Sequence, residues 1–132
     1  MANLTNMNTT LTSPAWAGDY FNREHVVPGG GRVDPAAFTA DATGKKFIQA
    51  GTVIGRTYAE RLAGTAFGPA LATDDEVFIV AHDVRDAADN TDVDIYRPGS
   101  LVKENFLPNF GTLPDGVLSK IRSLYQTTIG TN

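Results

Sequence analysis

The chain has 132 residues, a formal net charge of −4 and a sequence pI of about 5.0, which suits one domain that buries its own core. Nucleic acid is not an expected partner, because binding to phosphates depends on clustered Lys and Arg. The chain has no cysteine, which excludes a disulfide framework, a thiolate metal site and a thiol nucleophile. The longest uninterrupted apolar run, Val77 to Ala81, is far shorter than the ~20 residues of a membrane helix. We therefore expect no membrane partner, and we expect synthesis in the cytoplasm because the N-terminus lacks a basic region followed by an apolar one.

Residues 1–14 predict an extended N-terminal arm. They carry no charged side chain and are dominated by Asn and Thr, with a few apolar residues between them. Such a stretch has little to bury by itself, yet it can become ordered by adding a strand to an exposed sheet edge of a partner. The alternative is a frayed terminus. The candidate partner-binding residues of this arm are Leu4, Thr5, Met7, Thr9, Thr10 and Leu11, with Trp16 at its root.

The only tryptophan, Trp16, is followed closely by Tyr20 and Phe21. Such a group of aromatic residues is unusual for a linker that makes no contacts, because large aromatic side chains contribute several kcal/mol to stability when they are buried. Two interpretations stay open. Trp16 either anchors the arm on the core of its own domain or serves as an anchor between subunits, where Trp is a frequent hot spot.

The most glycine-dense run is His25 to Arg32. It lacks the Gly-x-x-x-x-Gly-Lys-Ser/Thr spacing of a phosphate-binding loop, so we expect no nucleotide cofactor there. We interpret the run as a flexible loop. It leads to Asp34, which is placed to cap a short helical turn whose first residue is Pro35.

Four short apolar and β-branched runs, separated by Gly, Pro, Asp and Asn, predict strands in the middle of the chain. The runs are Phe47–Thr57, Glu76–Val84, Asp92–Arg97 and Ser100–Phe106. Residues Tyr58–Leu62, between the first two runs, fit either one helical turn or a loop. The pattern predicts a mainly β domain of the α+β class over residues 15–132.

An acidic segment lies between the second and third predicted strands. Calcium prefers several carboxylate oxygens, but the spacing here does not match an EF-hand loop, so we predict a solvated turn and no metal site. His82 precedes Asp83, and neighbours on a strand point to opposite faces. With no usual nucleophile or zinc motif in the sequence, we expect no catalytic residues and no cofactor. The acidic residues are Asp83, Asp86, Asp89, Asp92 and Asp94.

The C-terminal part predicts a helix over about 115–125. Thr112 is placed as its hydroxyl cap, Pro114 lies in its first turn, and the helix is expected to end near Gln126. One apolar stripe recurs at helical spacing and predicts a buried face, while Lys120 and Arg122 lie off the stripe, where water solvates them. The stripe consists of Val117, Leu118, Ile121, Leu124 and Tyr125.

Several of these segments, taken in order, resemble the head decoration proteins of tailed phages, the family of the phage lambda capsid-stabilising protein. They are Gly51-Thr52-Val53-Ile54-Gly55, Phe67-Gly68-Pro69-Ala70, Val77 to Val84, and Val93 to Val102 leading to Phe106-Leu107-Pro108. The resemblance covers roughly half of the chain, and the closing helix and terminal extended segment are similar as well. The insertion from Tyr58 to Ala66 departs from the family pattern.

The resemblance implies a small β-barrel or β-tulip-like domain that acts as a structural protein. Members of the family bind the outside of the expanded capsid, so the implied partner is the major capsid protein and the implied location is the exterior of the virion. Trimers at local three-fold positions are implied too. The alternatives from other classes are a small enzyme that uses the acidic segment with His82, and a glycan- or receptor-binding module of a virion.

Overall fold

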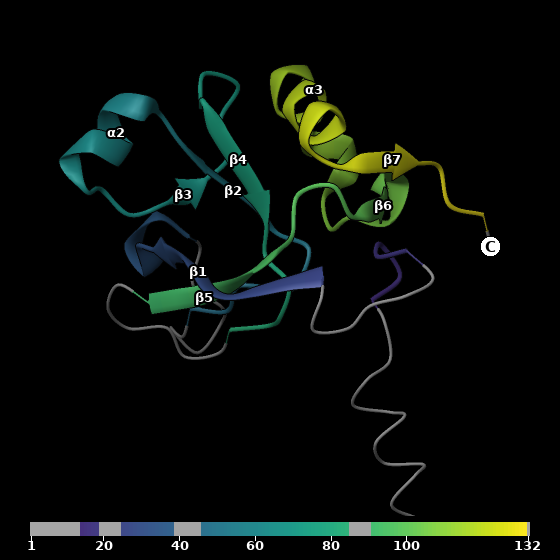
Figure 1. The fold of residues 1–132 in the computed structure, drawn as a ribbon, viewed down its shortest axis with the longest axis horizontal. Coiled ribbons are helices and arrows are strands. Elements are labelled where there is room, and N and C mark those ends of the chain that lie inside the picture. The colour runs from purple at the N-terminus through teal and green to yellow at the C-terminus, as the bar shows by residue number, and fades with distance from the viewer. Residues whose placement is uncertain (1–13, 19–24, 39–45, 85–90, 132) are drawn as a thin grey trace, which may run out of the picture.

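The computed structural model describes residues 14–18, 25–38, 46–84 and 91–131 (Figure 1). This part of the chain is a mainly β domain of the α+β class, as the sequence predicted. Its strands are β1 (Val26–Val33), β2 (Val53–Arg56), β3 (Gly68–Pro69), β4 (Glu76–Ile79), β5 (Thr91–Tyr96), β6 (Leu101–Lys103) and β7 (Gln126–Thr128). Its helices are α2 (Tyr58–Ala63) and α3 (Asp115–Leu124), with short 3-10 turns η2 (Pro35–Ala37), η3 (Glu104–Phe106) and η4 (Phe110–Thr112).

The described strands form three small sheets and no closed barrel, so the predicted barrel is wrong for this part of the chain. β1 pairs with β5, β2 lies between β3 and β4, and β6 pairs with β7 in parallel. A barrel needs a continuous ladder in which every strand has two neighbours. Here the first two sheets are joined only by isolated bridges, such as Val80 with Ile95.

Strand β1 is the largest departure from the sequence prediction, which took His25 to Arg32 as a flexible loop. Its register with β5 shifts between Val27 and Gly31, where Gly29 has a φ of 63°. The glycines permit close packing, because a Cβ atom at Gly31 would lie 3.0 Å from Cδ1 of Ile95. Glycine here forms a bulge and lets two backbones approach each other, which are regular uses of glycine within a strand.

The core consists of two buried clusters on opposite sides of β2. Val53 belongs to the first cluster and its neighbour Ile54 to the second, as alternation along a strand requires. The first cluster lies against α3 and includes Ile79, Tyr96 and Ile121. Figure 1 shows α3 beside β6 and β7 at one end of the molecule, and α2 near β3 at the other end.

The helical predictions are confirmed in part. Asp34 caps η2 as predicted, since its carboxylate accepts a hydrogen bond from the backbone N–H of Ala36 at 3.0 Å. Tyr58–Leu62 forms a helix rather than a loop, α2, which begins with a capping box between Thr57 and Glu60.

The predicted cap of the C-terminal helix is wrong. Thr112 lies in η4 and donates its hydroxyl to the carbonyl of Asn109 at 2.9 Å, while α3 begins after Pro114 without a side-chain cap. The apolar stripe is buried at Val117 and Ile121, but Leu124 is 37% exposed. Leu124 is the last residue of α3, where the chain turns away into β7.

Candidate interaction surface

Of the predicted partner-binding residues, only Trp16 lies in the described part of the chain. Leu4, Thr5, Met7, Thr9, Thr10 and Leu11 lie outside it, as do Tyr20, Phe21, Asp86 and Asp89. The structure therefore describes the root of the arm and the surface around it.

Trp16 is buried in the core of its own domain, with 3% of its surface exposed. Its ring meets the ring of Tyr96 edge-on, with the centroids 5.0 Å apart. Gly51 has a φ of 94°, and a Cβ atom there would lie 2.6 Å from Nε1 of Trp16. Of the two interpretations of Trp16, the structure supports the anchor on the domain's own core.

The backbone of the root is also fixed, because residues 16–18 lie along β6 as a short antiparallel partner. Ala17 bridges to Val102. Gly18 donates its N–H to the carbonyl of Leu101 at 3.1 Å, and Lys103 donates its N–H to the carbonyl of Trp16 at 2.7 Å. Residues 1–13 are thus attached to a base held by side-chain burial and by backbone hydrogen bonds.

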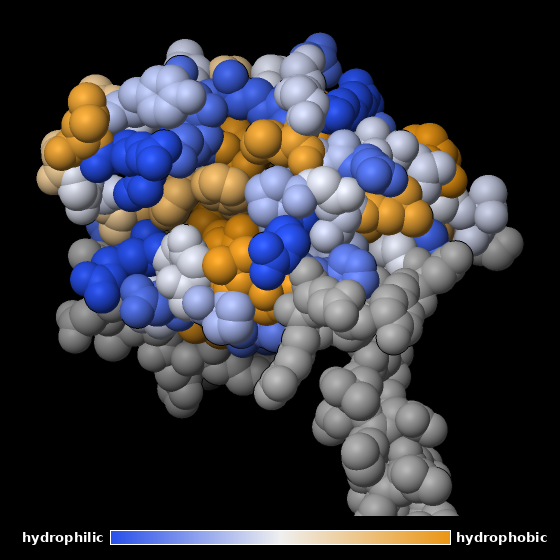
Figure 2. Space-filling model, in the orientation of Figure 1, coloured by the Kyte–Doolittle hydropathy of each residue, from blue (hydrophilic) through white to orange (hydrophobic). Residues whose placement is uncertain are grey.

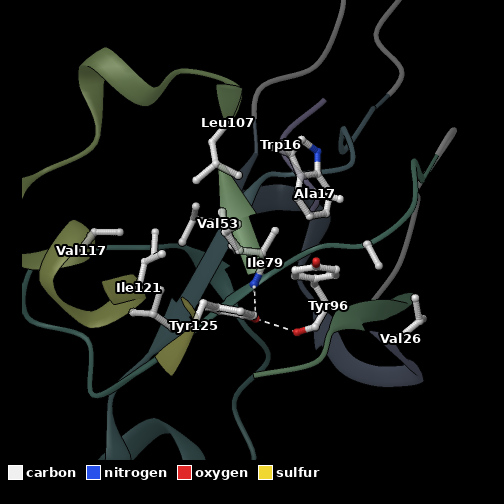
Figure 3. Packing of buried hydrophobic residues seen from close by; sticks show 13 residues of the cluster. Trp16, Ala17, Val26, Val53, Ile79, Tyr96, Leu107, Val117, Ile121 and Tyr125 are labelled. Carbon is white, nitrogen blue, oxygen red and sulfur yellow. Dashed lines mark hydrogen bonds between the residues drawn. The ribbon is translucent and has the colours of Figure 1, made fainter. Parts of the chain in front are cut away.

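A buried hydrogen-bonded tyrosine connects this base with the end of α3 (Figure 3). The hydroxyl of Tyr125 donates to the carbonyl of Tyr96 at 2.6 Å and accepts the N–H of Ile79 at 3.2 Å. Burial raises the pKa of Tyr125 well above its usual value, with a smaller opposite effect from the Ile79 N–H. The Tyr96 hydroxyl donates to the carbonyl of Leu101 at 2.7 Å, so the network reaches β6.

A buried carboxylate ties α3 to η3. Glu104 is 4% exposed and accepts two hydrogen bonds from Arg122, at 3.0 Å from Nε and 2.7 Å from Nη2. Arg122 lies off the apolar stripe and is 51% exposed, as the sequence predicted, and the structure adds its pairing with Glu104. A bidentate pair of this kind orients both partners, and breaking it would leave a buried charge without its cation.

Exposed apolar side chains occur at several places on the described surface, and two of these places matter here. Leu101, Leu124 and Ile129 lie on or next to β6 and β7 and are 37%, 37% and 60% exposed. In Figure 2, orange atoms appear on this side of the molecule. Helix α2 buries none of its residues, and its Leu62 is 89% exposed.

The acidic segment makes specific contacts that the prediction of a solvated turn did not include. Nδ1 of His82 lies 2.7 Å from Oδ2 of Asp94, and Asp94 Oδ1 accepts the N–H of Gly29 at 2.9 Å. Asp83 accepts the N–H of Ala50 at 2.7 Å. His82 therefore pairs with Asp94, which is distant in the sequence. Among the residues that the structure describes, no group of acidic or histidine side chains is arranged to hold a metal ion.

The Asp94 contacts predict a pH-dependent contribution to stability. Burial raises the pKa of Asp94, but the Gly29 N–H and His82 outweigh it, so the pKa is lowered from 3.8. A lowered pKa stabilises the fold above the unfolded value and loses this effect as the pH falls through the folded value. Asp94→Asn should therefore be less stable than wild type at pH 7, and urea melts should show this difference shrinking below about pH 4.

Asp74 provides a control of opposite sign. It is 3% exposed, and burial raises its pKa above 3.8, although the N–H of Leu71 counteracts part of this. The wild-type fold therefore loses stability as the pH rises from about 3.8 through the raised pKa of Asp74, so Asp74→Asn should become more stable relative to wild type over that range. A difference that does not change with pH at either position would contradict the assignments.

Comparison with family models, curated proteins and solved structures finds no match to this chain. No helix in the described ranges is long and apolar enough to cross a membrane.

Proposed function

We propose that this chain is a structural virion protein, a head decoration or cement protein that binds the outer surface of an expanded phage capsid. Its partner is the major capsid protein, it assembles as a homotrimer with a β-tulip-like fold, and it has no catalytic role. It is made in the host cytoplasm and resides on the capsid exterior. The proposal extends the resemblance in the middle of the chain.

The observation that best supports the proposal is the fixed root of the arm. Residues 1–13 are uncharged and carry apolar side chains that have little to bury by themselves. They are attached to a base in which Trp16 is buried and Ala17 is bridged to β6. A fixed base holds the segment near its binding site, and several such segments acting together convert weak contacts into strong attachment.

Deletion of residues 2–13 is the direct test. In dilute solution the deletion should leave the melting curve nearly unchanged, because the root at Trp16 remains in place. Binding to expanded shells of the parent virion should weaken at least tenfold, about 1.4 kcal/mol, because the contacts of Leu4, Met7 and Leu11 are lost. Co-sedimentation of protein with shells measures this binding.

The control for this test is Leu62→Ser, which removes an exposed apolar side chain far from the arm root and should bind shells like wild type. If the deletion leaves shell binding unchanged, residues 2–13 do not contribute to binding and are only a frayed terminus. Failure of the deleted protein to fold would place the arm in the domain's own core.

A further inference from the structure

The small sheet that holds the arm root ends on its other side at β7, whose outer edge pairs with no strand of the described residues. Gln126 donates its N–H to the carbonyl of Ser100 at 3.1 Å, so its backbone faces β6. The backbone of Gly130 also faces that side. Its N–H donates to Oδ1 of Asn105 at 2.7 Å, and its carbonyl accepts a hydrogen bond from Nδ2 of Asn105 at 3.0 Å.

Backbone direction alternates along an extended chain, so the N–H and C=O groups of Thr127 and Ile129 point away from β6. Within the described part of the chain, no strand pairs with β7 on that side. These groups form a row of donors and acceptors that a further strand can use.

This edge is held in place at both ends. Before β7, the Tyr125 hydroxyl is bound to the backbone of Tyr96 and Ile79. After β7, the Asn105 side chain holds Gly130, and the Phe106 ring occupies the space where a side chain at Gly130 would lie. A preformed edge requires little further ordering when a strand binds to it, which favours binding.

The edge lacks the charged residues and prolines by which many proteins protect such edges from pairing. Gln126 to Gly130 contains neither, and Ile129 is 60% exposed. Figure 2 shows apolar atoms over β6 and β7, in the region where Leu101 and Leu124 are partly exposed. The chemistry that suits this edge is an uncharged, Thr-rich segment with a few apolar side chains.

Residues 1–13 of the chain have this chemistry. They contain no charged side chain, several Thr residues, and Leu4, Met7 and Leu11. Fully extended, thirteen residues span about 40 Å. This length is enough to cross from one molecule to a neighbour of similar size.

The direction of the root favours a second copy over the same molecule as the acceptor. Ala17 is antiparallel to β6, so the chain leaves toward the end of the sheet where Lys103 and Thr128 lie, on the side of β6 opposite to β7. To reach its own β7 edge, the arm would have to pass around η3 and Ile129 and reverse its direction. Pairing with a neighbour requires no reversal.

From these observations we infer that residues 2–13 of one copy add a strand to the β7 edge of a second copy, at Thr127 and Ile129. Each molecule donates an arm and accepts one, so two copies that exchange arms form a closed dimer, and a longer series closes into a ring when the rotation between copies permits. The same arm cannot pair with β7 and with a capsid subunit at once. Exchange between copies is therefore the state of the arm away from the shell, and it does not depend on the proposed function.

The test compares full-length wild type with Thr127→Pro by sedimentation velocity over a range of concentrations. Wild type should associate reversibly as the concentration rises. Thr127→Pro should remain monomeric with native circular dichroism, because proline removes an N–H that faces away from β6 and is tolerated on an edge strand. A synthetic peptide of residues 2–13, added in excess, should dissociate wild-type oligomers.

Two further variants keep the test decisive. Ile129→Lys places a charge beside the edge and should also be monomeric. This variant tests the inference if Thr127→Pro fails to fold. Leu62→Lys, the matched control on α2, should associate like wild type. The inference is overturned if wild type is monomeric throughout, if both edge variants associate undiminished, or if the peptide has no effect on the oligomers.

Discussion

Replacing Trp16 by Ala should lower the free energy of unfolding by about 3 to 5 kcal/mol, the usual range for truncation of a buried tryptophan. The ring is 3% exposed, meets Tyr96 edge-on and lies against Gly51, so its removal leaves a cavity that the backbone cannot fill easily. Urea denaturation followed by far-ultraviolet circular dichroism measures the loss.

Trp16→Phe is the matched variant, because it keeps an aromatic ring near Tyr96 and removes less volume. Its loss should be clearly smaller than that of Trp16→Ala. A loss below about 1 kcal/mol for the Ala variant would mean that Trp16 is not part of the folded core. Under the proposed function, the Ala variant should also bind shells more weakly at temperatures where it remains folded, because Trp16 holds the arm root.

Replacing Ile121 by Ala should cost about 2 to 5 kcal/mol, whereas Leu124→Ala should cost less than about 1 kcal/mol. Both residues belong to the apolar stripe of α3, but Ile121 is fully buried in the first core cluster and Leu124 is 37% exposed. Chemical denaturation of the two variants side by side tests the burial directly.

The comparison of Ile121→Ala with Leu124→Ala can contradict this prediction in two ways. Equal large losses would mean that Leu124 is buried, and equal small losses would place the whole helix at the surface. Val117→Ala is a second buried position on the same face and should behave like Ile121, although the smaller side chain gives a smaller loss.

The elements that depend on neighbouring residues could be predicted from the sequence. The apolar runs around Val53, Val77 and Val93 became strands, and the stripe at Val117 and Ile121 became the buried face of α3. Strand alternation and helical spacing reflect the local geometry of the chain, so they are visible in the order of the residues.

The candidate surface could be predicted only in outline. Asn and Thr content, with no charge, predicts an arm at residues 1–14, which stays a prediction because residues 1–13 lie outside the described part of the chain, and aromatic content singled out Trp16. Whether the anchor lies in the domain's own core depends on Gly51 and Tyr96, which come from distant parts of the chain. The spacing of residues along the sequence does not predict a contact between such distant segments.

The sequence by itself determined the fold class, the lack of thiol chemistry and the helical face of α3, because composition and local periodicity are sufficient for these properties. The tertiary structure alone decided that the glycine run forms β1, that His82 pairs with Asp94, and that no strand in the described part of the chain pairs with the outer edge of β7. Each of these depends on which segments lie side by side. The free energy of long-range packing selects that arrangement, and short-range residue preferences do not contain it.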